Sequence, residues 1–153
     1  MKPRIARTRR GEGFDLNFPV AERELLASLP LQLVEILDDD PATDPALARL
    51  FPDAYTAADT DLADEYRRLM NDDLRDRLRG ALEAMSSSAH ATHVSGEELY
   101  AWMTALGQLR LVLGTRIGVT EDWEPDDDDA AGQLYGYLTW LQGEVVEALA
   151  STL

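Results

Sequence analysis

The stretch from Leu99 to Gly118, LYAWMTALGQLRLVLGTRIG, constrains the fold more than any other part of this chain. At about 100° per residue, one helical stripe holds six apolar side chains, which are Leu99, Trp102, Leu106, Leu109, Leu113 and Ile117. Leu111 and Val112 widen the apolar surface on either side of that stripe, so only a narrow polar strip remains. Because a helix that is apolar nearly all round is buried, we predict a mainly α fold, a single helical domain around this central helix.

Apolar spacing and capping residues predict four further helices. An Asp44-Pro45 pair is a typical helix start, because the Asp side chain accepts a backbone N–H and Pro has none to lose. Pro30 lies inside the first of these helices and is expected to kink or split it. The predicted helices run over Val20 to Asp38, Ala46 to Phe51, Thr60 to Met85 and Asp128 to Ser151.

The long helix predicted over Thr60 to Met85 carries a row of apolar residues that we expect to face the core. A polar linker, Ser86 to Val94, then leads to Ser95 and Glu98, which have the spacing of a capping box at the start of the central helix. The expected inward row consists of Leu62, Tyr66, Met70, Leu74, Leu78, Ala81 and Met85.

The first 18 residues form a basic arm that is predicted to be a β-hairpin, with the helical domain occupying residues 19–153. Strands over Lys2 to Arg9 and Gly13 to Phe18 flank a turn at residues 10–12, where Gly11 supplies the positive φ that tight turns need. A two-stranded hairpin alone is marginally stable. We therefore expect the arm to lean on the helices.

Charge is distributed unevenly along the chain. The formal net charge is −15, yet the first ten residues hold five basic side chains and no acid. An acidic body repels nucleic acid and anionic membranes. The arm, through Arg4, Arg7 and Arg9, either contacts an acidic partner or folds back onto its own acidic domain.

Several classes of function lack the residues they need. The chain contains no cysteine, which excludes thiol catalysis and cysteine metal sites and fits a reducing compartment. The basic start is not followed by the long apolar run of a secretory signal, and no stretch approaches the roughly 18 apolar residues of a membrane span. We expect a cytoplasmic protein.

Two arginines are the main candidates for ligand chemistry. Arg110 and Arg116 flank the apolar surface of the central helix, where an unpaired charge is costly. Each is predicted to form a structural ion pair with a carboxylate such as Glu65, Asp53 or Glu144. The alternative is that both line a cleft that binds an anion or another small ligand.

No other pattern supports a metal, a cofactor or a catalytic centre. His90 and His93 supply only half of a metal site. The acidic run from Asp126 to Asp129 lacks the ligand spacing of a calcium loop, and Ser86 to Ser88 have no base nearby. We predict no metal, no cofactor and no enzyme activity, with an enzyme of unrecognised type as part of the small-ligand alternative.

The final predicted helix offers a candidate partner surface. Gly136 and Gly143 lie beside Trp140 on the side opposite the inward row of that helix. A flat surface with an aromatic anchor suits a protein partner or a homodimer. The alternative is that the hairpin covers Trp140.

Four segments resemble one known family. DPALARLFPDAY begins at Asp44, EYRRLM at Glu65, WMTALGQLRLVLGTRIGVT at Trp102 and LYGYLTWLQ at Leu134. Together they are similar to an actinobacterial domain-of-unknown-function family that includes the oxidative-stress regulator AosR. The resemblance implies a cytoplasmic, non-enzymatic protein that regulates transcription through protein partners, in a family whose genes often lie near a protease-adaptor gene. Thiol-based oxidant sensing does not carry over, because this chain has no cysteine.

These observations favour an interaction or regulatory protein with partners in the transcription or protease machinery. The acidic body, the basic arm, the missing catalytic constellation and the family resemblance all support that hypothesis. A small-ligand or anion-binding domain that uses Arg110 and Arg116 is the alternative.

Overall fold

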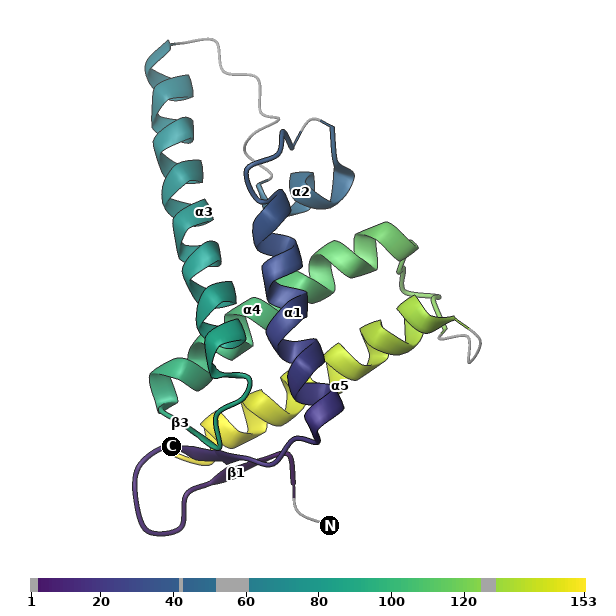
Figure 1. Ribbon diagram of the computed structural model, residues 1–153. Helices are drawn as coiled ribbons and strands as arrows, with labels where there is room; N and C mark the ends of the chain where they lie inside the picture. The colour runs from purple at the N-terminus through teal and green to yellow at the C-terminus, as the bar shows by residue number, and fades with distance from the viewer. Residues whose placement is uncertain (1–2, 42, 52–60, 125–128) are drawn as a thin grey trace.

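The structure is a computed structural model that describes residues 3–41, 43–51, 61–124 and 129–153. Within these ranges the fold is mainly α, as predicted, with a small sheet near the N-terminus (Figure 1). In chain order the elements are β1 (Ile5–Arg7), β2 (Phe14–Leu16), α1 (Val20–Ile36), α2 (Pro45–Leu50), α3 (Asp61–Ser88), β3 (His93–Val94), α4 (Gly96–Ile117) and α5 (Ala130–Ala150).

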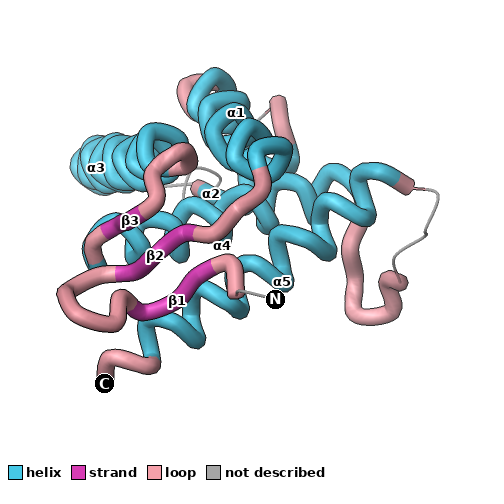
Figure 2. The backbone as a smooth tube through the Cα atoms, turned by 60° about the horizontal axis from the view of Figure 1, so that its bottom comes forward, coloured by secondary structure: helices cyan, strands magenta, loops and turns pink. Residues whose placement is uncertain are grey.

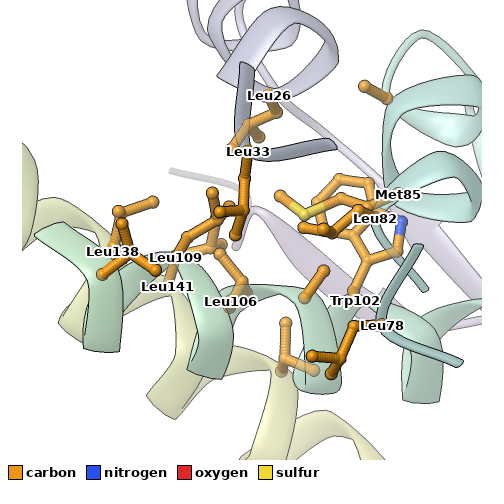
Figure 3. Packing of buried hydrophobic residues seen from close by; sticks show 14 of the residues in the cluster. Leu26, Leu33, Leu78, Leu82, Met85, Trp102, Leu106, Leu109, Leu138 and Leu141 are labelled. Atoms are coloured by element: carbon orange, nitrogen blue, oxygen red, sulfur yellow. The ribbon is translucent and has the colours of Figure 1, made fainter. Parts of the chain in front are cut away.

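Helix α4 is the centre of the domain, which confirms the prediction from its apolar surface. It packs against α2, α3 and α5, and α1 crosses it (Figure 1). Trp102 and Leu106 are completely buried, and side chains from α1, α3 and α5 converge on this stretch (Figure 3). Leu113 and Ile117, near the end of the helix, are only partly buried.

Both ends of α4 are capped, and the cap at its start is the one predicted. The Ser95 hydroxyl accepts a hydrogen bond from the Glu98 N–H at 3.1 Å, and the Glu98 carboxylate accepts one from the Ser95 N–H at 3.0 Å. Gly118 ends the helix with a φ of 75°, a left-handed conformation that glycine adopts without strain. The sequence therefore sets the boundaries of α4 by local chemistry.

The sheet has one more strand than the predicted hairpin. β1 and β2 pair antiparallel, with Ile5 opposite Leu16, and β3 pairs with the other edge of β2 (Figure 2). A two-residue strand such as His93–Val94 has no periodicity to detect, so the sequence pattern missed it. The positive φ in the turn region belongs to Gly13, at 93°, and not to Gly11.

Pro30 does not split α1, so that part of the expectation is wrong. The helix runs without interruption from Val20 to Ile36 although proline lacks the N–H that would bond one turn back. Pro30, Leu26 and Leu33 are all buried on the same side of α1. Burial of this face offsets the lost hydrogen bond.

Helix α3 continues past Met85 to Ser88, so the predicted linker begins three residues later. Serine hydroxyls accompany this last turn: Ser86 donates to the Ala27 carbonyl at 2.5 Å, and Ser88 donates to the Ala84 carbonyl at 2.7 Å. Hydroxyls that bond to carbonyls in this way are compatible with a helix.

Arg23, which no sequence pattern singles out, joins three parts of the fold. Its guanidinium donates to the carbonyls of Leu16 at 2.8 Å and Ala91 at 2.5 Å. It also donates to the carbonyls of Phe18 at 2.9 Å and Ala89 at 3.2 Å. One side chain on α1 thus holds the end of β2 against the turn between α3 and β3.

Candidate functional site

The N-terminal half of α3 projects beyond the other helices (Figure 1). This part of the helix carries large exposed apolar side chains. Leu62 is 79% exposed, Tyr66 65%, Leu69 65% and Met70 46%. We call these four residues the α3 stripe. The expectation that Leu62, Tyr66 and Met70 face the core is therefore wrong, whereas Leu78 and Met85 further along are buried as predicted.

The α3 stripe points away from the domain's own core. Residues four apart drift by about 40° per step around an α-helix, so a row with that spacing winds from one side of the helix to the other. At about 100° per residue, the centre of Leu62, Tyr66 and Leu69 lies about 160° from the centre of the buried Leu78, Leu82 and Met85. The stripe is thus a separate surface and not an extension of the core.

Polar residues bound the α3 stripe. The next position in its four-three spacing is Asp73, whose carboxylate lies 3.3 Å from the Arg77 guanidinium. Glu65 is exposed on the side of the helix next to Leu62, whereas the exposed Arg68 lies about half a turn from Tyr66. Spacing of four and three residues is the pattern by which one helix packs along another. The stripe therefore has the size and shape to contact about two turns of a partner helix.

Trp140 also lies on the surface, in the arrangement that the sequence predicted. It is 45% exposed, and its ring centroid lies 5.8 Å from that of Tyr137. A Cβ placed on Gly136 or Gly143 meets no atom within 4 Å, so the helix surface beside the indole is open. The hairpin leaves nearly half of Trp140 uncovered.

Arg4 of the basic arm belongs to an internal network. It donates to the Glu22 carboxylate at 2.9 Å, and the Tyr137 hydroxyl donates to the same carboxylate at 2.8 Å. Burial raises the pKa of Glu22, but hydrogen bonds from Arg4 and Tyr137 outweigh burial and bring the pKa below its ordinary value. Burial is the larger cause that raises the pKa of Tyr137, and the hydrogen bond to Glu22 raises it further.

The other two predicted arm residues are exposed. Arg7 donates to the Ser151 carbonyl at 3.4 Å, which brings the arm to the end of α5, and Arg9 is exposed near the hairpin turn. At Arg4 and Arg7, therefore, the arm folds back onto its own domain. Arg9 stays a predicted partner contact.

Arg110 and Arg116 do not share a cleft. Arg116 donates to the Asp44 carboxylate at 3.0 Å, so it has the predicted ion pair but with a different acid from those expected. Burial raises the pKa of Asp44, while the Ala46 N–H and Arg116 lower it more. Asp44 becomes this partner because it caps the neighbouring α2, a proximity that sequence distance conceals.

Arg110 has neutral partners in place of the predicted carboxylate. Its Nε donates to the Thr139 hydroxyl at 3.0 Å, and its Nη1 donates to the Gln142 side-chain oxygen. Its guanidinium also lies over the Tyr135 ring, 5.5 Å from the centroid. Glu65 and Glu144 form no ion pair with it, and Asp53 lies outside the described residues.

The weaker metal candidates stay apart. His93 lies in β3, with Nδ1 3.2 Å from the Thr8 hydroxyl and 3.4 Å from the Asp15 carboxylate. Among the described residues, no three His, Asp or Glu side chains gather into a metal-binding group. Residues 126–128 of the acidic run lie outside the described ranges, and Asp129 caps α5.

A family model described as "Domain of unknown function (DUF2017)" matches residues 3–149. The chain belongs to the DUF2017 family. Comparisons with curated proteins and with solved structures found no match.

The DUF2017 match begins before β1 and ends one residue before the end of α5, so it includes the α3 stripe, Trp140 and Arg110. In the part of the chain that the structure describes, no helix has both the length and the apolar character that crossing a bilayer requires.

Proposed function

We propose that this DUF2017 protein acts by binding another protein, and that the α3 stripe is the contact surface. The observation that carries the proposal is the exposure of four large apolar side chains on α3, three of which lie on the helix face that points away from the core. Exposing such a cluster to water is unfavourable, and clustered surface apolar residues mark interaction sites. Packing against a partner removes this cost.

The partner that fits best presents an apolar helix. The four-three spacing of Leu62, Tyr66 and Leu69 forms a narrow apolar row along the helix, which we call the seam. A partner helix packs along such a row more completely than a partner with a flat surface does. Glu65 beside the seam and the Asp73–Arg77 pair at its end supply charges of both signs for a polar rim.

The cellular role proposed here is non-enzymatic and regulatory. Resemblance of the four segments given above to the actinobacterial family of AosR supports stress-linked control of transcription in the cytoplasm, through transcription or protease machinery. The absence of cysteine means that any response to oxidants comes from the partner or from another signal.

Co-purification from native cells tests this proposal. The Leu62→Asp/Leu69→Asp double variant changes only exposed side chains, so its circular dichroism and melting temperature should match those of the parent chain. We expect it to lose a protein that the parent chain retains in stoichiometric amount. Retention of that protein by the double variant, with loss in Trp140→Glu, would move the contact surface to α5 and contradict the proposal.

A further inference from the structure

A cleft of about 400 Å³ opens between α2, α4 and α5. Arg49 from α2, Arg110 from α4 and Tyr135 from α5 line it, together with the α4 glycines Gly107 and Gly114. Its volume falls in the range of roughly 300–1,000 Å³ that is typical of small-molecule sites. The α3 stripe takes no part in it.

The two arginines of this cleft lack acidic partners. Within the described ranges, the Arg49 guanidinium has no ion pair or hydrogen bond, and Arg110 bonds only to the neutral Thr139 and Gln142. Five arginines elsewhere in the fold each lie within 4.0 Å of a carboxylate oxygen, namely Arg4, Arg75, Arg77, Arg79 and Arg116. In a chain of net charge −15, two uncompensated arginines in one cleft form a local positive site.

Arg110 is held in place before any ligand arrives. Thr139 and Gln142 accept hydrogen bonds from two of its nitrogens, and its guanidinium lies over the Tyr135 ring, while among the described residues Nη2 has no hydrogen-bond partner. A guanidinium fixed by neutral groups retains its full charge for an incoming anion. Arg49 on α2 contributes a second arginine to the lining of the same cleft.

Two glycines on α4 make this arrangement possible. A Cβ on Gly114 would lie 3.0 Å from Cε2 of Tyr135, and a Cβ on Gly107 would lie 3.2 Å from Nε2 of Gln142. Glycine at these two positions leaves room for Tyr135 and Gln142, which both contact the Arg110 guanidinium. Glycine inside a helix lowers the stability of that helix. The close packing of Tyr135 and Gln142 against α4 therefore comes with a less stable α4.

We infer that this cleft binds a small organic anion through a phosphate or carboxylate group held between Arg49 and Arg110. Paired guanidinium groups recognise both kinds of oxyanion. Tyr135 and the glycine-lined wall leave space for an uncharged part of the ligand. This inference is independent of the proposed function, because Arg49 and Arg110 lie outside the α3 stripe.

Calorimetric titration with inorganic phosphate and, separately, with succinate tests the inference at constant ionic strength. We expect at least one probe to bind, and Arg49→Gln or Arg110→Gln to weaken it about tenfold or more. Arg68→Gln, an exposed arginine on α3, is the matched control and should leave affinity within about twofold.

Each result decides the inference. Binding of phosphate alone assigns a phosphate-bearing ligand, and binding of succinate alone assigns a carboxylate. Arg49 is exposed, so we expect Arg49→Gln to fold. It therefore tests the site even if Arg110→Gln does not fold. Absence of binding by both probes at about 10 mM, or equal weakening by Arg68→Gln, would overturn it. Leu62→Asp/Leu69→Asp should leave probe affinity unchanged, which separates this site from the proposed contact surface.

Discussion

The indole nitrogen of Trp102, in the first half of α4, donates a hydrogen bond of 2.8 Å to the Ser88 hydroxyl at the end of α3. Ser88 in turn donates to the Ala84 carbonyl at 2.7 Å. Trp102 is completely buried, and its ring stacks on Phe18 with centroids 5.8 Å apart. One polar contact therefore lets the largest core side chain fill the junction of α3, α4 and the arm without an unsatisfied donor.

Ser88→Ala is expected to lower the free energy of unfolding by about 1–3 kcal/mol, because it leaves the buried Trp102 N–H without an acceptor. Chemical denaturation measures this loss. Ser87→Ala removes a neighbouring exposed hydroxyl and should change stability by less than about 0.5 kcal/mol. Equal losses in the two variants would show that the bond to Trp102 contributes nothing specific.

Arg23→Lys is expected to destabilise the protein by about 2 kcal/mol or more, since a single ammonium cannot reach the four carbonyls that the guanidinium serves. Arg68→Lys, on an exposed part of α3, is the control and should be nearly neutral. Thermal unfolding compares them. A stable Arg23→Lys variant would mean that water replaces the lost donors.

Glu22→Gln tests the network of Arg4 and Tyr137. The folded-state pKa of Glu22 lies below its ordinary value, so its contribution is present above the ordinary pKa and is lost as pH falls through the folded value. At pH 7 we expect a loss of about 1 kcal/mol. The difference between parent and variant should vanish in acid, below the ordinary pKa range of glutamate. A difference that persists there would contradict a charge-based contribution.

Two glycine substitutions should have opposite signs. Gly13→Ala places a Cβ 2.5 Å from the Val94 carbonyl oxygen at a φ of 93°, and we expect a loss of more than about 1 kcal/mol. Gly136→Ala on α5 meets open space and should gain about 0.5–1 kcal/mol. Denaturation midpoints measure both. A destabilised Gly136→Ala would reveal a close contact at this surface.

Sequence patterns predicted those parts of the fold in which local chemistry decides the outcome. The apolar surface of α4, the Ser95 cap and the Asp44 helix start are confirmed because each depends on residues only a few positions apart. Pro30 was expected to interrupt α1, but the helix continues through it. Burial of the surrounding face, which depends on the whole fold, outweighs one lost hydrogen bond.

The candidate sites were less predictable because they depend on contacts between distant segments. The row from Leu62 to Met85 gives no sign of where the neighbouring helices stop, and that point decides which of its residues face water. Arg49 joins Arg110 only because α2 packs on α4. Arg116, which the alternative reading of the sequence placed in one cleft with Arg110, does not line this cleft.

Site-specific photocrosslinking tests the central claim that a partner helix packs on the α3 stripe. The chain has no cysteine, so Tyr66→Cys accepts a single benzophenone label, and Arg68→Cys places the same label half a turn away. The account predicts that the Tyr66 label crosslinks one distinct protein in native cell extract. It also predicts that the Arg68 label does not, and that Leu62→Asp/Leu69→Asp abolishes the product. Equal crosslinking from both positions, or a product that survives the double variant, would contradict it.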